Sequence, residues 1–180
     1  MTRMTAAEFY KAFPESKLRV SKKPVNRAKK KAVPLTLQEM RNDWAERNDY
    51  AEGKGDLLVC LYLPLDLCQR QDARLEVRGW KAAKMKREVT GYLRMQCLPL
   101  AEPIAGRPYV RCVRLSSGEP DKYADWAKLA VDCLCAPNKR SPHRLNIIKD
   151  DAPKFAEIDQ QWRLAKPGKG YCVFEVYSGI

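Results

Sequence analysis

The amino-acid sequence predicts an α/β fold with at least four strands and two helices, preceded by a basic extension. Three observations lead to this prediction. The chain has 180 residues, enough for one domain with an appendage. Its 45% hydrophobic and 31% charged residues are typical of a globular chain with a core, not of a collagen-like or disordered one. After residue 56, short apolar runs typical of strands alternate with apolar stripes at helical spacing.

Residues 1–55 are expected to form a basic N-terminal arm with a short helix. Residues 5–13 suit a short amphipathic helix, and residues 17–31 then carry eight Lys and Arg side chains and no acid. Blocks of like charge resist packing and commonly remain flexible. A second helix is predicted over residues 36–48, because apolar residues recur there at i, i+3 and i+7. These residues are Leu37, Met40 and Trp44.

The predicted folded domain covers residues 56–180 and begins after the break at Gly53-Lys54-Gly55. Its first strand is the apolar run from Leu57 to Leu63, which Pro64 ends. Residues 65–79 mix polar and apolar positions and are expected to form a long loop. A helix is predicted over residues 80–95, with its apolar side chains facing inward. These side chains are Ala83, Val89 and Leu93.

The second half of the domain repeats this alternation of strand and helix. Turn signals rich in Gly, Pro and Ser separate its elements. Alternating apolar positions predict the strands, and an inward apolar stripe predicts the helix. In chain order, the expected elements are a strand at 109–115, a helix at 122–135, a basic loop at 138–144, and strands at 155–164 and 171–177.

The charge of the chain points to a polyanionic partner. Lys and Arg number 34 against 22 acids, which gives a net charge of +12. Such a field attracts nucleic acid first and acidic membranes or proteins second. No run reaches the ~18 apolar residues that span a bilayer, and no secretory signal is visible. We therefore expect a cytoplasmic protein without a membrane partner.

The cysteine and histidine content excludes several kinds of active site. The seven cysteines include no Cys-x-x-Cys pair, and His143 is the single histidine. A zinc site needs about four grouped Cys and His ligands, so reduced core thiols are the better interpretation. A Ser–His or Cys–His hydrolase is not expected either. Any catalytic metal would therefore be held by carboxylates.

Two groups of carboxylates lie where the chain is predicted to change structure. Glu119-Pro120-Asp121 directly follows a strand, and residues i and i+2 of an extended segment project to the same side. Asp150-Asp151 lies at a second such edge. Hard oxygen ligands from two segments suit Mg²⁺ or Mn²⁺. The alternative is that these acids only cap helix N-termini and complement the helix dipole.

A third group of charges recurs at helical spacing after Asp121. Asp121, Asp125, Lys128 and Asp132 are spaced by four, three and four residues, which would place them on one helical face. This face could be an exposed set of ion pairs. Alternatively, Lys128 could lie near the acids and neutralise a phosphate that develops negative charge. The spacing leaves both interpretations open.

The segment from Glu119 to Leu134 resembles the signature of the RusA-like Holliday junction resolvases, which are small metal-dependent endodeoxyribonucleases. Their pattern is Asp-x-Asp-Asn, then a Lys, then Asp-x-Leu four residues beyond that Lys, and later Asp-Asp. Lys128, Asp132-Cys133-Leu134 and Asp150-Asp151-Ala152-Pro153 fit it. Glu119 stands where the pattern has its first Asp, and Lys122 stands where it has Asn.

This resemblance covers roughly residues 57–178 and implies a small mixed β-sheet with two main helices. It implies hydrolysis of phosphodiester bonds in four-way junctions or other branched DNA, by a homodimer, during recombination and repair in a bacterial or phage-infected cell. The residues implied to bind Mg²⁺, or Mn²⁺, are Glu119, Asp121, Asp150 and Asp151. The implied catalytic residues are Glu119, Asp121, Lys128 and Asp151.

Basic side chains of the predicted helix at 80–95 and of the loop at 138–144 are the candidate DNA contacts. Phosphate contacts of this kind weaken steeply with salt. The candidates are Lys81, Lys84, Lys86, Arg87, Lys139 and Arg140. The alternative hypotheses are a catalytically inactive relative that only binds or regulates nucleic acid, and an adaptor for an acidic protein.

Overall fold

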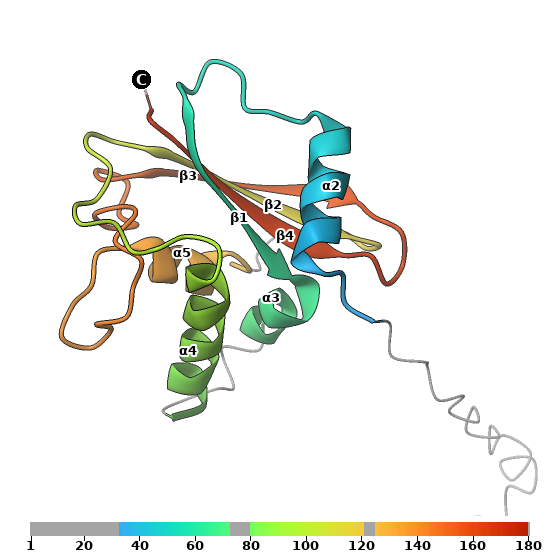
Figure 1. Ribbon diagram of the computed structural model, residues 1–180, viewed down its shortest axis with the longest axis horizontal. Helices are drawn as coiled ribbons and strands as arrows, with labels where there is room; N and C mark the ends of the chain where they lie inside the picture. The colour runs from blue at the N-terminus through green and yellow to red at the C-terminus, as the bar shows by residue number, and fades with distance from the viewer. Residues whose placement is uncertain (1–32, 73–79, 121–124, 180) are drawn as a thin grey trace, which may run out of the picture. The chain divides into compact units, whose positions relative to one another are not determined.

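The computed structural model describes residues 33–72, 80–120 and 125–179 of the chain (Figure 1). The short helix expected at 5–13 and the basic block at 17–31 lie outside the described residues. No described helix has both the length and the apolar character that crossing a membrane requires. The elements are α2 (Leu37–Arg47), β1 (Leu57–Pro64), α3 (Leu65–Asp72), α4 (Trp80–Arg94), β2 (Tyr109–Ser116), α5 (Lys128–Leu134), β3 (Glu157–Leu164) and β4 (Tyr171–Tyr177).

The four strands form one mixed sheet in the order β1-β4-β2-β3. β4 is antiparallel to both of its neighbours, β1 and β2, whereas β2 and β3 are parallel. Every residue of β2 and β4 is buried, because these central strands are covered on both faces. The α/β class expected from the sequence is therefore confirmed, with a mixed sheet.

The helices cover the two faces of the sheet unequally. α3, α4 and α5 pack against one face, whose apolar residues include Cys112 and Phe174. α2 packs against the other face, on Val113 and Val173 (Figure 1). The two faces arise from one alternating pattern, because successive side chains of a strand point to opposite sides.

α2 is part of this folded unit, although the sequence analysis placed it in the arm. Its buried side chains are Met40 (0% exposed) and Trp44 (5% exposed), which pack on the sheet. A capping box starts the helix: Glu39 N donates to Thr36 Oγ1 (3.3 Å), and Thr36 N donates to Glu39 Oε2 (2.8 Å). The apolar spacing that predicted the helix also gives it an apolar side, and this side is buried against the sheet.

Three expectations about the helices of the other face were wrong. Residues 65–72 form α3 instead of a loop, because Leu65 and Cys68, three apart, turn toward the core. This stripe is too short to detect by periodicity alone. α5 begins only at Lys128, and Asp125 precedes it in non-helical backbone, so the expected helical face of four charges does not extend to Asp125. Ala83, expected to point inward, is exposed.

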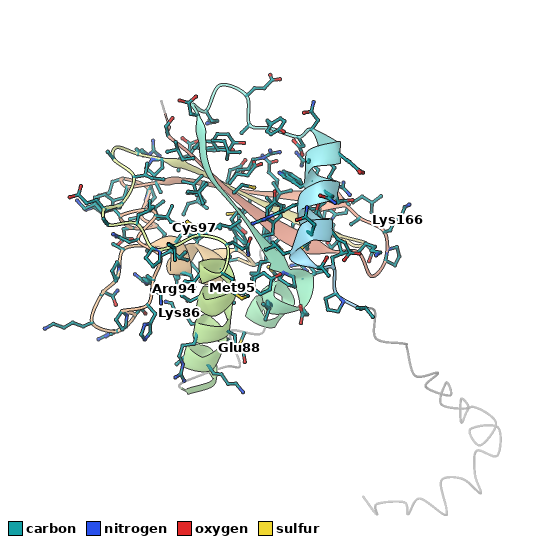
Figure 2. The ribbon with its side chains drawn as sticks, viewed as in Figure 1. Lys86, Glu88, Arg94, Met95, Cys97 and Lys166 are labelled. Atoms are coloured by element: carbon teal, nitrogen blue, oxygen red, sulfur yellow. The ribbon has the colours of Figure 1, made fainter. Side chains whose placement is uncertain are left out.

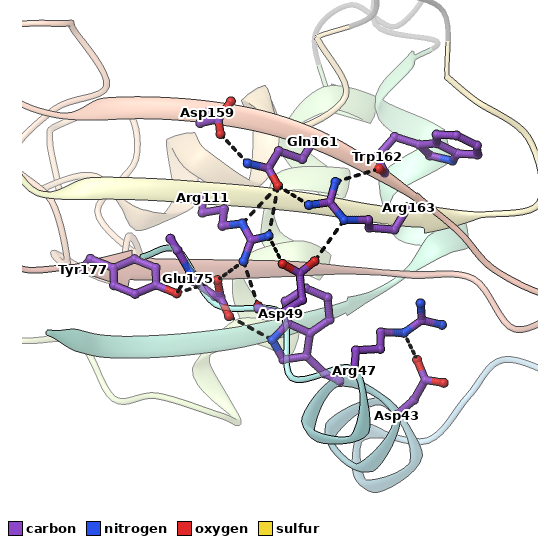
Figure 3. Close-up of polar contacts among 12 residues, drawn as sticks. Asp43, Arg47, Asp49, Arg111, Asp159, Gln161, Trp162, Arg163, Glu175 and Tyr177 are labelled. Atoms are coloured by element: carbon purple, nitrogen blue, oxygen red, sulfur yellow. Dashed lines mark hydrogen bonds and ion pairs between the residues drawn. The ribbon is translucent and has the colours of Figure 1, made fainter. Parts of the chain in front are cut away.

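A network of polar side chains is buried under α2 (Figure 3). Glu175 of β4 is 0% exposed and Arg111 of β2 is 2% exposed. Arg111 Nη1 lies 3.2 Å from Glu175 Oε2, and its Nη2 lies 2.6 Å from Asp49 Oδ1. Trp44 Nε1 and Tyr177 Oη each donate to the Glu175 carboxylate at 2.9 Å. Both oxygens of this carboxylate therefore have partners, as a charge removed from water requires.

The network continues from β2 to β3. Gln161 Oε1 accepts from Arg111 Nη2 (3.0 Å) and from Arg163 Nη2 (2.9 Å), and Arg163 Nε donates to Asp49 Oδ2 (2.9 Å). Burial alone would raise the pKa of Asp49, but the hydrogen bonds and charges of the two arginines outweigh it and lower this pKa. The network joins the segment after α2 to three strands and holds the helix on the sheet.

The seven cysteines are free thiols, as the sequence analysis expected, and five of them are buried. Burial raises the pKa of the Cys135 thiol to about 11, so this side chain is protonated at neutral pH. The cysteines therefore serve as small apolar residues of the core.

Candidate functional site

The structure brings Lys128 into contact with Asp151. Lys128 is the first residue of α5, and Asp151 lies in the loop between α5 and β3. Lys128 Nζ contacts Asp151 Oδ2 and lies 3.1 Å from Asp132 Oδ1. The side chains of Lys128 and Asp151 are 36% and 21% exposed, so solvent and ligands can reach this pair. Among the described acids proposed as metal ligands, Asp151 contacts this lysine.

Backbone hydrogen bonds hold the two segments together. Ile147 N and Ile148 N both donate to Leu134 O, at 2.8 and 3.1 Å, and Cys135 pairs with Ile148 as an isolated parallel bridge. Ile147 and Ile148 are fully buried, so the segment that leads to Asp151 is anchored in the core. A loop that would otherwise be free is thus fixed against α5.

A pocket of about 270 Å³ opens at this ion pair. Asp125, Lys128 and Asp151 contribute its charged side chains, and Ile158 and Gln160 of β3 also line it. Asp125 Oδ1 accepts a hydrogen bond from Gln160 Nε2 at 3.0 Å. Asp125 therefore reaches the site from non-helical backbone before α5 and is held there by the edge strand of the sheet.

The remaining acids singled out from the sequence are less well placed or lie outside the described residues. Glu119 is exposed after β2, and it does not line the pocket. Asp121 lies in the undescribed segment 121–124. Asp150 is exposed, and its Oδ1 accepts from Ala152 N at 3.1 Å, so it stabilises the turn before β3. Within the described ranges, no three His, Cys, Asp or Glu side chains gather closely enough to hold a metal ion.

The donor chemistry of the pocket nevertheless suits a hard cation. Asp125 and Asp151 present carboxylate oxygens, and Gln160 adds an amide group, the oxygen donors on which Mg²⁺ relies. Lys128 pairs with Asp151. A cation here would compete with Lys128 for the Asp151 carboxylate.

The proposed DNA contacts lie on α4 and in the loop after α5. Lys84 and Arg87 of α4 are exposed, as are Lys139 and Arg140 in the loop after α5, while the side chain of Lys81 lies outside the described residues. Lys86 is half-buried, and its Nζ lies 3.4 Å from Asp132 Oδ2. Figure 2 shows Lys86 and Glu88 on different sides of α4.

Asp132 links the basic side of α4 to the candidate site. Its carboxylate lies between Lys86 Nζ (3.4 Å) and Lys128 Nζ (3.1 Å), and Lys128 in turn contacts Asp151. Three segments thus share one row of alternating charges. The row contains two lysines and two aspartates, so its charges balance one another.

Sequence reasoning did not place Asp125 and Gln160 in the site. Asp125 was assigned to a helical face, and Gln160 was one polar position in a predicted strand. Ile158 and Gln160 share a face of β3, but Gln160 is exposed there, so the alternation of the strand does not mark it as a site residue. Comparison with known proteins adds no relative: the chain matches no family model, no curated protein and no solved structure.

Proposed function

We propose that this chain is a metal-dependent endodeoxyribonuclease that hydrolyses phosphodiester bonds in branched DNA, such as Holliday junctions, in recombination and repair. The observation that carries the proposal is the contact between Lys128 Nζ and Asp151 Oδ2 at the mouth of the pocket. These two residues were selected by their likeness to the RusA-like resolvases, from parts of the sequence that the fold brings together.

The metal ligands proposed from the resemblance are the carboxylates of Glu119, Asp121, Asp150 and Asp151. Of the described members of this set Asp151 lines the pocket, and Asp125 joins the set because it lines the pocket too. Bound Mg²⁺ or Mn²⁺ would supply activation of a water molecule and stabilisation of the departing oxygen. A carboxylate cluster is suited to such an ion because it offers hard oxygen ligands.

The residues of the chain have separate tasks in this mechanism. Lys128 offsets negative charge on the scissile phosphate in the transition state, since its ammonium group lies at the pocket. Asp132 fixes the position of Lys128 through the contact at 3.1 Å. Gln160 orients the Asp125 carboxylate through its amide N–H. Such fixed groups stabilise a transition state because they need not reorganise during the reaction.

DNA binding in this proposal relies on phosphate contacts from the basic side chains of α4 and of the loop after α5. The net charge of +12 supports such binding, which should weaken steeply with salt. Two matched cuts in a four-way junction require two sites related by symmetry, so the proposal includes a homodimer.

The test is cleavage of labelled four-way junctions and linear duplex with Mg²⁺, with Mn²⁺ or with EDTA. We expect metal-dependent cutting of the junction by the native protein and by Glu46→Gln, which removes an exposed carboxylate on α2. Asp151→Asn should reduce cutting by about 100-fold or more while junction binding persists. Cutting by Asp151→Asn at the native rate would refute the assignment of this carboxylate.

One observation favours a second candidate, a nucleic-acid-binding protein without nuclease activity. Among the described residues no three-ligand metal group forms, and Lys128 already balances Asp151. In this case the acids only pair with basic side chains. The same assay distinguishes the two candidates, because this protein would bind junctions in a salt-sensitive manner and cut none of them with any metal.

A further inference from the structure

A second pocket lies between α4 and the loop that follows α5, and its volume is about 250 Å³. In the described part of the chain its lining contains Lys and Arg side chains but no Asp or Glu. The polar and charged residues used below are Lys86, Arg87, Thr90, Arg140, His143 and Arg144. Their charges come from two segments that are far apart in the sequence.

α4 presents one face to this pocket and is fixed in that orientation. Arg87 and Thr90 lie on the same face because they are three residues apart in a helix. Thr90 Oγ1 donates to Lys86 O at 2.7 Å and lies 3.1 Å from the buried Cys133 Sγ of α5. The side of the pocket formed by α4 is therefore held against α5. The loop that forms the other side of the pocket follows α5.

The loop wall is organised by its own backbone. Asn138 Oδ1 accepts from Arg140 N (3.0 Å) and from Ser141 N (2.9 Å), which tightens the turn. Arg144 Nη1 donates to Ala136 O at 3.2 Å across the base of the loop. The following residue, Leu145, is fully buried, and its N donates to Cys133 O at 2.8 Å. The cationic side chains are thus presented from a loop tethered at both ends, which lowers the entropic cost of binding a ligand.

The pocket holds an unused hydrogen-bond donor. Arg144 Nε is buried and has no hydrogen-bond partner among the described residues. A buried donor of this kind is destabilising unless a partner is supplied. Arg87 and Arg140 are exposed at the same pocket. Three guanidinium groups and one ammonium group around a single small space suit an anion with several oxygens.

We propose that this pocket binds one backbone phosphate of a nucleic acid. A volume of about 250 Å³ is below the ~300–1,000 Å³ of pockets for drug-sized ligands, so it suits a phosphate and part of its sugar. The inference rests on the proposed function in taking DNA as the ligand. Lys86 joins the two pockets through Asp132 and Lys128, so a strand crossing the candidate site can continue to this one.

The single histidine of the chain allows a direct test. His143 lines the pocket, so its ring resonances in NMR spectra report on binding there without ambiguity. Thymidine dinucleotide, which carries one phosphodiester, is titrated into the full chain without metal. We expect a saturable shift of the His143 resonances. Arg140→Gln should weaken binding about tenfold, because it removes a charge-assisted hydrogen bond.

Lys166→Gln is the matched control, since it removes one exposed positive charge away from α4 (Figure 2). It should leave the titration unchanged. Unshifted His143 resonances, or equal weakening by Arg140→Gln and Lys166→Gln, would overturn the proposal. Inorganic phosphate that displaces the dinucleotide at equal or lower concentration would overturn the assignment to a nucleic-acid backbone.

The outcome is separable from the nuclease proposal. Asp151→Asn should keep the His143 shift while it loses cleavage. A native protein that shifts its His143 resonances but cuts no junction would support the phosphate pocket and contradict the nuclease function. Metal-dependent cutting without any shift of the His143 resonances would support the nuclease function and contradict the phosphate pocket.

Discussion

The two faces of the sheet use charge in different ways. Under α2, Arg111 and Glu175 are almost completely buried, and each pairs with the other and with further groups. Around α5, Lys128 and Asp151 are 36% and 21% exposed and lie at a pocket. A buried ion pair is strongly destabilising to break, whereas an exposed pair contributes ~0–1 kcal/mol and can exchange partners with a ligand. The first set of charges therefore serves the fold, and the second is accessible to a ligand.

Arg111→Met should give the largest effect and test the first half of this comparison. It leaves the Glu175 carboxylate buried without its cation, so the free energy of unfolding should fall by about 3–5 kcal/mol. Urea denaturation followed by circular dichroism measures this change. Arg163→Met is the matched control, because Arg163 pairs with the same Asp49 but is 40% exposed. Its cost should stay within about 1 kcal/mol, and equal losses in both variants would contradict the distinction.

Lys128→Met tests the second half of the comparison. It removes the cation that contacts Asp151 and Asp132, so junction cleavage should fall by about 10²–10³-fold through loss of transition-state stabilisation. The free energy of unfolding should change by less than about 1 kcal/mol because the pair is partly exposed. Single-turnover cleavage and urea denaturation on the same sample separate the two quantities. A large loss of stability with native cleavage would assign Lys128 to the fold instead.

Trp44→Phe should give a smaller effect on the α2 face. The variant keeps the aromatic packing but removes the Nε1–H that donates to Glu175 Oε1 at 2.9 Å. Leaving this buried acceptor with one donor fewer should cost roughly 1–3 kcal/mol, measured by urea denaturation. Junction binding should be unchanged, since Trp44 lies on the face opposite the pocket. Weaker junction binding in the folded variant would show that the two faces are coupled.

The smallest effect concerns acid stability. The pKa of Asp49 is lowered in the folded protein by Arg111 and Arg163, so its ionised form stabilises the fold. This contribution is complete above the unfolded pKa of about 3.9 and is lost as the pH falls through the lower folded value. Asp49→Asn should therefore be less stable at neutral pH and should lose less stability on acidification than the native protein. Parallel pH profiles of the two proteins in thermal denaturation would contradict this role.

Much of the fold was predictable because its elements carry local signals. The alternation of β2 and β4 and the spacing of Met40 and Trp44 repeat within a few residues, and the structure has these elements at the expected places. α3 escaped prediction because its apolar stripe covers only two turns. The late start of α5 also escaped, because the helical spacing of its charges continues into backbone that is not helical.

The candidate site was predictable only in part. Lys128, Asp150 and Asp151 were selected from short motifs, and the fold places Lys128 against Asp151 but leaves Asp150 in a turn. Asp125 belongs to the site through a hydrogen bond to Gln160 of β3, which is 35 residues away in the sequence. A contact between residues so far apart in the sequence cannot be predicted from local spacing.

Composition and local spacing were enough to predict the basic charge, the lack of grouped zinc ligands, the strand alternation and the apolar stripe of α2. Only the tertiary structure decided that Arg111 and Glu175 share a buried network and that α4 and the loop after α5 enclose a cationic pocket. The physical reason is that the energy of a charge depends on what replaces its water. The groups that replace water around a buried charge come from distant segments of the chain. Packing of the whole core brings these segments together.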